Sequence, residues 1–337
     1  MSLTTSPYDD VQFPPFSSLP FRKGDPTGAI WGFYESLVTG GSPTDEEQPL
    51  DELGSLNLLT PNRILRASRE EIQLGRVVSL NWPLQKPAPA GYQRHTFEHK
   101  IVKWPGKTIL DDEIRQFYND LSWNEIVDDM NVPLSVDKPL RNGIHKFQGR
   151  IVGRGVFLDY LSYAQSKGIT FAPEKQYLVT AEELESCAKL QGLEFRQGDI
   201  LFIRMGYVSW YNNATPEQRA EAVSGLTKAV GVRQTQAEVE WLWLVQTLRL
   251  HPFMIIKQSK RNHHFAAVAS DTPAFEARPS IQEWNLHDYL LALWGTPMGE
   301  LFDLEELSKT CKELNRYSFF ITSSPLNIVN GIASPPK

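Results

Sequence analysis

The stretch VTAEELESCAKLQGLEFRQGDILFIRMGYV, residues 179–208, contains one complete helix-to-strand unit. Thr180 and Glu183 have the spacing of a capping box at a helix start, and Gly192 is placed to end that helix. The apolar run ILFI at 200–203 is typical of a strand that is buried on both faces. A helix that returns directly to a buried strand predicts an α/β fold.

Neighbouring stretches repeat this unit. Residues 60–75 have Thr60 as a helix cap, Pro61 at the first helical position and a glycine at the end, and they lead into the strand candidate RVVSLNW at 76–82. Further helix starts are predicted at TPEQ (215–218), at TQAE (235–238) and at Asp303, whose helix leads into the strand-like RYSFFITSS (316–324). This alternation predicts a single α/β domain over residues 1–337, with a mixed sheet flanked by helices.

Three segments interrupt the alternation. Residues 40–52 are acidic and rich in turn formers, which predicts a solvated loop. Residues 131–143 have two prolines and no periodicity, so we expect a loop there as well. Residues 244–261 extend a helix that must break at Pro252.

Composition excludes several classes of partner. The chain has 337 residues, is 41% hydrophobic and carries a net charge of −6, and its only basic cluster is the short KQSKR at 257–261. We therefore expect no nucleic-acid or anionic-membrane partner. No run approaches the ~18 apolar residues of a membrane helix, and the first residues do not resemble a secretory leader, so a cytoplasmic location is expected. Cys187 and Cys311 lie in helical patterns, which predicts buried free thiols.

The candidate chemistry begins with LHDYLLALWGTPMGE, residues 286–300. Its leucines and tyrosine repeat at helical spacing, and Gly295 ends the predicted helix. His287 lies in the first turn and Glu300 follows the break, so the two are either metal ligands or a core-edge histidine and a surface charge. Spacing alone leaves both readings open, because a catalytic zinc site needs three protein ligands.

A second candidate segment is HHFAAVASDTPAFE, residues 263–276. Its small residues predict a central strand that runs into an Asp-Thr-Pro turn, and His264 and Asp271 are pocket candidates at its two ends. Adjacent strand residues point to opposite faces, so only one of His263 and His264 can serve a given site. The chain has no Gly-rich phosphate loop, paired Cys-x-x-Cys, His-Glu-x-x-His or nucleophile elbow, which removes support for dinucleotide, nucleotide and serine-hydrolase functions.

Seven stretches together resemble the Putative cyclase family, the group of bacterial kynurenine formamidase and isatin hydrolase, and the likeness is strongest to its fungal branch. They are GSLNLLTPNRI, VVSLNWPL, GRIVGRGVFLDY, GDILFIRMGYV, HHFAAVASDTPAFE, LHDYLLALWGTPMGELFDLEEL and SFFITSSPLNI. The resemblance implies a swivelling β/β/α fold, a homodimer, and one or two divalent metals, zinc or manganese, used to hydrolyse an amide. It also implies that His287 and Glu300 help to bind metal. Compared with the fungal relatives, residues 244–261 resemble an insertion.

The other half of that family's site is missing here. The ligand-bearing His-x-Gly-Thr-His motif, or its fungal counterpart, should follow TILDD (108–112), yet there is no histidine between His99 and His145. In one alignment SWNEIVDD (122–129) is a degenerate copy that puts Asp128 at a ligand or catalytic position. In the alignment that we prefer, the ligand-bearing segment is deleted outright. Nearby aspartates could replace the lost ligands with oxygen donors; they are Asp111, Asp112, Asp128 and Asp129.

Two functions therefore follow from the sequence. The first is a metal-dependent hydrolase or cyclase that acts on the amide C–N bond of a small molecule, such as an arylformamide or a cyclic amide. The second is a non-hydrolytic family member, either a metal-free isomerase or cyclase or a ligand-binding pseudoenzyme, in which the metal is lost. Nine tryptophans are compatible with a planar aromatic substrate and equally with ordinary packing. No residue is assigned as the catalytic base.

Overall fold

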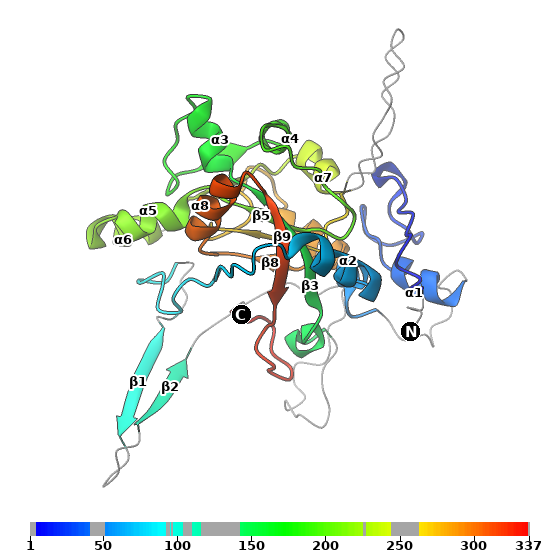
Figure 1. Cartoon of the computed structure of the whole chain (residues 1–337), viewed down its shortest axis with the longest axis horizontal. Helices are drawn as coiled ribbons and strands as arrows, with labels where there is room; N and C mark the ends of the chain where they lie inside the picture. Colours follow the sequence, from blue (N-terminus) through cyan, green and yellow to red (C-terminus); the bar gives the residue numbers. More distant parts are fainter. Residues whose placement is uncertain are drawn as a thin grey trace.

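A five-stranded mixed sheet forms the centre of the molecule (Figure 1). The structure is a computed structural model that describes residues 5–40, 51–91, 95, 97–103, 110–115, 142–224, 227–243 and 263–335. The strand order is β8–β7–β5–β3–β9, with the first four parallel and β9 antiparallel to β3. The bounds are β3 (Ile151–Leu158), β5 (Ile200–Ile203), β7 (Ala267–Ser270), β8 (Met298–Gly299) and β9 (Ser318–Ser323). The predicted α/β fold with a mixed sheet is confirmed.

The caps predicted at Thr60, Thr180 and Thr215 lie where helices begin. The helix predicted to open at Asp303 begins at Glu305, whose amide donates to the Asp303 carboxylate. The Thr180–Glu183 capping box opens α4 (Ala181–Leu190), and Thr60 accepts a hydrogen bond from the backbone at the start of α2 (Pro61–Glu71). A second capping box, from Thr215, opens α6 (Pro216–Val223). The other α-helices are α1 (Phe33–Thr39), α3 (Tyr160–Ser166), α5 (Tyr207–Asn213), α7 (Gln236–Trp243) and α8 (Glu305–Leu314).

Helices lie against the sheet from several directions. Helix α2 packs across β3 and β9, whereas α4 contacts β3 and also packs against α3 and α7. Figure 1 shows α3, α4 and α7 grouped together, with α5 and α6 beyond one end of the sheet. Strand β5 is buried along its whole length, as its apolar sequence predicts. Cys187 of α4 and Cys311 of α8 are buried free thiols, as expected.

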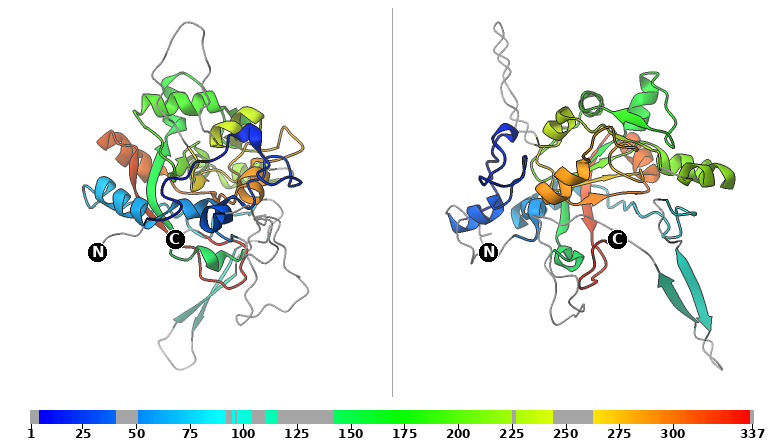
Figure 2. Two further views of the ribbon diagram at one scale, coloured as in Figure 1. Left: turned by 90° about the vertical axis from the view of Figure 1, so that its right-hand side faces the viewer. Right: turned by 180° about the vertical axis from the view of Figure 1, so that it is seen from behind.

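Two small sheets accompany the central one. Strands β4 (Tyr177–Val179) and β6 (Val230–Val232) pair in parallel, and β6 is bridged further to Glu276. Strands β1 (Glu98–Lys103) and β2 (Leu110–Arg115) form an antiparallel ribbon. This ribbon projects away from the rest of the chain in all three views (Figures 1 and 2).

The prediction of a strand at residues 76–82 is wrong, because this segment is not part of any strand. Its alternation is real, because Leu80 and Trp82 are buried whereas Val77 is 92% exposed. The backbone of this segment does not join a ladder; instead the Leu80 carbonyl accepts a hydrogen bond from the Asp303 amide. Alternation therefore reports one buried face, and a strand also needs a neighbouring strand with which to pair.

The acidic segment 40–52 is only partly described. At its end, Asp51 is not a solvated charge: its carboxylate accepts hydrogen bonds from the Leu53 and Gly54 amides and the Asn57 side chain. Burial raises the pKa of Asp51 to about 6. The predicted loop at 131–143 lies almost wholly outside the described residues, and the predicted insertion 244–261 lies wholly outside them.

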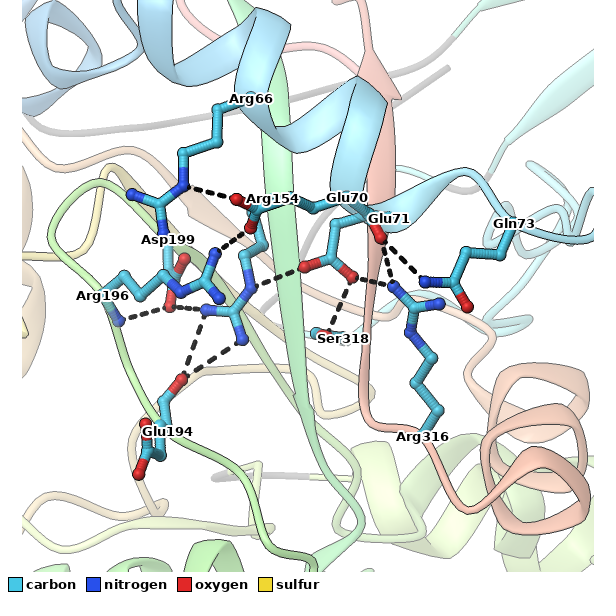
Figure 3. A network of polar contacts seen from close by, with 10 residues as sticks. All are labelled: Arg66, Glu70, Glu71, Gln73, Arg154, Glu194, Arg196, Asp199, Arg316 and Ser318. Atoms are coloured by element: carbon cyan, nitrogen blue, oxygen red, sulfur yellow. Dashed lines mark hydrogen bonds and ion pairs between the residues drawn. The ribbon is translucent and has the colours of Figure 1, made fainter.

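A buried charge network joins α2 to the sheet (Figure 3). Arg154 of β3 donates to the Glu71 carboxylate at 2.9 Å and to Asp199 at 2.7 Å, and all three side chains are at least 90% buried. Glu71, the last residue of α2, also accepts from Arg316 and Ser318. Because Asp199 immediately precedes β5, the network ties a helix and three strands together at the end of the sheet where β5 begins.

Among the described residues, no helix is long and apolar enough to span a membrane.

Candidate functional site

The carboxyl ends of four adjacent parallel strands are each followed at once by a charged residue. Asp159 follows β3, Arg204 follows β5, Asp271 follows β7 and Glu300 follows β8. Open α/β sheets bind their ligands at this edge. We therefore take this edge, and the helix that leads into β8, as the candidate site.

His287 and Glu300 meet at this edge. Nε2 of His287 lies 3.3 Å from a carboxylate oxygen of Glu300, although the two residues belong to different elements. On the other side of the ring, Nδ1 lies 2.8 Å from both carboxylate oxygens of Glu276. The side chain of Glu276 is fully buried, whereas those of His287 and Glu300 are 22% and 26% exposed. The ring is thus anchored by a fully buried carboxylate, whereas the His287–Glu300 pair is partly exposed.

The two carboxylates determine the charge of the ring. Burial alone would lower the pKa of His287, but the hydrogen bonds to Glu276 and Glu300 outweigh it and raise the pKa to about 10. With this pKa the ring is an imidazolium at neutral pH and donates from both nitrogens. Stability from these ion pairs is fully present below pH ~6.5, the unfolded value, and is lost as the pH rises towards 10.

The backbone of Glu276 packs closely against Gly231 of β6, in the small β4–β6 sheet. Its backbone bridges to Val232 of β6, and a Cβ on the neighbouring Gly231 would lie only 2.2 Å from the Glu276 carbonyl carbon. A side chain at position 231 would therefore displace Glu276. The amide of Ala277, next in the chain, donates to the Val232 carbonyl at 2.9 Å and completes the attachment.

The helix that carries His287 is not the regular α-helix that was expected. Residues Asp288–Leu293 form a π-helix, in which the Trp294 amide donates to the Tyr289 carbonyl, five residues back. Short π segments are frequent at functional sites. The apolar face is as predicted, with Leu286 and Leu290 fully buried.

A segment near the N-terminus, residues 26–31, covers the end of this π-helix and is called the strap. The indole of Trp31 donates to the Ala292 carbonyl at 2.8 Å, and the Ile30 amide donates to the Leu293 carbonyl at 3.1 Å. In return, the indole of Trp294 donates to the Gly28 carbonyl. The strap thus satisfies carbonyls that a helix end leaves free.

The loop that carries Glu300 is held by close backbone contacts. Gly54 has φ +53°, and a Cβ there would lie 2.2 Å from the Gly295 carbonyl oxygen. The hydroxyl of Ser55 donates to both the Ala266 and Gly295 carbonyls. Leu301, directly after Glu300, has φ +56°, which is a strained value for a leucine.

Asp271 lies at the same edge but performs a different task. Its carboxylate accepts hydrogen bonds from the Met205 and Gly206 amides at 2.6 and 2.7 Å, so it fixes the turn after β5. Burial raises its pKa to about 7, although the two amides act in the opposite direction. Beside it, Arg204 binds Asp159 and, with two nitrogens, Glu305 of α8.

The remaining candidates are not brought to His287. His264 precedes β7, whereas Asp271 follows it, and the His264 ring stacks on Phe13 with a centroid separation of 3.7 Å. Burial lowers the pKa of His264 well below its usual value, so the ring is neutral. The buried His263 has a different environment, with Nδ1 at 3.0 Å from the Trp241 carbonyl. Asp128 lies outside the described residues.

Sequence reasoning missed Glu276 and Arg278. Arg278 donates to Glu276 at 3.0 Å, so it belongs to the same cluster. Glu276 was only the last letter of the HHFAAVASDTPAFE stretch, and nothing in its spacing to His287 marked a contact. Charged residues directly after buried strands are a usable signal, and it would have identified Arg204 and Asp159.

The pair has the geometry of two ligands of a divalent metal. Two donors at ~2.1 Å from a tetrahedral zinc lie about 3.4 Å apart, close to the 3.3 Å between His287 Nε2 and Glu300. Glu276 is placed as the outer carboxylate that metal-binding histidines usually have. Among the described residues, however, no group of three or more His, Cys, Asp or Glu side chains could hold a metal ion. The described residues thus supply two donors and no complete metal site.

Comparisons with known proteins agree with this fold. The model of the family described as "Putative cyclase" matches residues 94–244. A crystal structure described as a novel cyclase is similar at 26% identity, with a TM-score of 0.67 over 85% of this chain and 94% of that chain. Isatin hydrolase A from Ralstonia solanacearum is similar at 16% identity, with a TM-score of 0.46 over 87% of this chain and 97% of that chain. No curated protein matches.

Proposed function

We propose that this chain, whose sequence and fold support its assignment to the cyclase family, is a small-molecule enzyme acting on an amide or cyclic-amide C–N bond. The observation that carries the proposal is the His287–Glu300 pair, which is assembled from two elements at the carboxyl edge and is partly open to solvent. Its position in the fungal branch of the family stays a prediction.

The pair is complementary to an amide. Nε2 of the protonated His287 offers a hydrogen-bond donor, and Glu300 beside it offers an acceptor. An amide presents the opposite set, a carbonyl oxygen that accepts and an N–H that donates. In this role Glu276 keeps the ring in place while the ligand replaces part of the His287–Glu300 contact.

A divalent zinc or manganese ion would be held by His287 and Glu300. When bound, such an ion polarises a carbonyl and lowers the pKa of water. The remaining ligands would have to come from outside the described residues, where the candidates are Asp128 and Asp129; Asp111 and Asp112 belong to β2, in the ribbon that projects away from the rest of the chain. No step of the proposal depends on this ion.

A second function is supported by a specific observation, the occupation of both His287 nitrogens by carboxylates. An ion-paired ring of this kind needs no metal. The chain would then be a non-hydrolytic family member that binds a small molecule or acts as a metal-free isomerase or cyclase.

The deciding experiment measures metal content and turnover together. The protein is purified after growth with zinc and manganese, alongside His287→Ala and the control His145→Ala, and is assayed by mass spectrometry and against an arylformamide and a cyclic-amide panel. The primary proposal expects turnover that His287→Ala abolishes and the control retains. Chelator-sensitive turnover with about one equivalent of metal would select the metal-dependent form. Absence of turnover with metal supplied would refute the hydrolase proposal and leave ligand binding.

The homodimer, the cytoplasmic location and an aromatic substrate stay predictions. Size-exclusion chromatography with light scattering tests the first directly.

A further inference from the structure

Arg278 donates hydrogen bonds to two residues that position His287, namely Glu276 and Asn285. Its Nη2 donates to the Glu276 carboxylate at 3.0 Å, and this carboxylate accepts from the His287 ring. Its Nη1 donates to the Asn285 side chain at 2.9 Å. One guanidinium thus reaches the group that fixes the ring and the residue that starts the His287 helix.

Asn285 is tied to that helix on both sides. The backbone N–H of Asn285 donates to the Asp288 carboxylate at 2.8 Å, and the backbone N–H of Asp288 donates to the backbone carbonyl of Asn285 at 3.1 Å. His287 lies between these two residues in sequence. Moving Asn285 therefore moves the backbone of His287.

The backbone of Arg278 is itself fixed. It exchanges two hydrogen bonds with Ala229, at 3.0 and 3.2 Å, next to β6. The planar fork of arginine can serve two acceptors at a fixed separation, whereas the point charge of lysine cannot.

We propose that Arg278 is a positioning residue for His287, acting on the ring through Glu276 and on the backbone through Asn285. The inference rests on the proposed function for its purpose, because it concerns the same site. Its physical content is independent of turnover: Arg278 keeps the Nδ1 proton of His287 on Glu276 and holds Nε2 towards Glu300.

The test is ¹H–¹⁵N NMR of protein labelled at histidine nitrogens. His287→Gln assigns the ring signal by its loss. We expect the wild-type Nδ1–H of His287 to exchange slowly, and Arg278→Met to abolish or split this resonance. Arg278→Lys should restore it only in part. Asn285→Ala, which removes one arm and leaves the ion pair, provides a milder variant if Arg278→Met does not fold.

Arg233→Met is the matched control, because Arg233 pairs with the equally buried Glu238 and is 32% exposed against 24% for Arg278. It should leave the His287 resonance unchanged. An unchanged resonance in both Arg278→Met and Asn285→Ala, or an equal loss in the control, would overturn the inference. So would a wild-type Nδ1 proton that exchanges as fast as that of the exposed His95.

Turnover or metal affinity, where found, should fall by about 10- to 100-fold in Arg278→Met, the usual effect of losing an outer partner. A wild-type protein without turnover but with the protected proton, lost in Arg278→Met, would refute the proposed function and uphold this inference.

Discussion

Replacing Arg154 by methionine should destabilise the protein strongly, because it removes the cation at the centre of the network in Figure 3. Arg154 has a 10% exposed side chain, and Glu71 and Asp199 are 4% and 2% exposed. After the substitution Glu71 keeps Arg316 and Ser318, whereas Asp199 keeps a single hydrogen-bond donor among the described residues, the Arg196 amide. Breaking a buried ion pair by removing one partner costs about 3–5 kcal/mol, so we expect a loss in that range.

Urea unfolding followed by circular dichroism measures this loss as a lower midpoint at unchanged slope. Arg66→Met is the control within the same network, because its pair with Glu70 is 58% and 42% exposed and should be worth less than about 1 kcal/mol. A double variant, Arg154→Met with Asp199→Asn, should recover part of the loss by neutralising the stranded carboxylate.

The pH dependence checks the same reasoning. Burial raises the pKa of Asp199 to about 6, above its value in the unfolded chain. The folded protein therefore holds this proton more tightly, and the contribution of Asp199 to the free energy of unfolding decreases as the pH rises from about 4 to 6. Without Arg154 the Asp199 carboxylate is harder still to ionise, so the loss should be larger at pH 8 than at pH 5. A loss equal to that of Arg66→Met, or one independent of pH, would refute the account.

Three further predictions concern the site. The raised pKa of Asp271, about 7, makes the free energy of unfolding fall by about 1.4 kcal/mol per pH unit between pH 4 and 7, and Asp271→Asn should remove this pH dependence. If urea unfolding at pH 5 and pH 7 shows the same change in stability for the wild type and the variant, the prediction is wrong. Gly231→Ala should displace Glu276, since the added Cβ meets its backbone at 2.2 Å, and a crystal structure of the variant with Glu276 unmoved would contradict that. Trp31→Phe leaves the Ala292 carbonyl without its donor and should cost about 1–3 kcal/mol in urea unfolding, so a change below 0.5 kcal/mol would argue against the strap.

Local rules predicted α2, α4, α6, α7 and α8 and three of the five central strands, β5, β7 and β9, because these are set by neighbours in sequence; α1, α3 and α5 were not predicted. The Thr180–Glu183 capping box and the apolar run 200–203 are examples, and both are confirmed. The predicted strand at 76–82 failed because pairing is a long-range property that alternation does not encode.

The candidate site was half visible in the sequence. His287 and Glu300 lie on one short segment; spacing left their role open, and the family resemblance pointed to both of them. Glu276 and Arg278 reach His287 through a turn and a second sheet, so no periodicity links them. The π-helix also escaped, because the apolar spacing was matched only to the period of an α-helix.

The strap has a consequence for how the protein is made. Trp31 bonds to a carbonyl 261 residues later, and Trp294 to one 266 residues earlier. At roughly 5–20 residues per second of synthesis, the strap leaves the ribosome tens of seconds before its partner helix exists. During that interval Trp31 and its apolar neighbours are exposed to solvent and to chaperones, and the ring of His287 can reach its final orientation only after Glu300 has been translated.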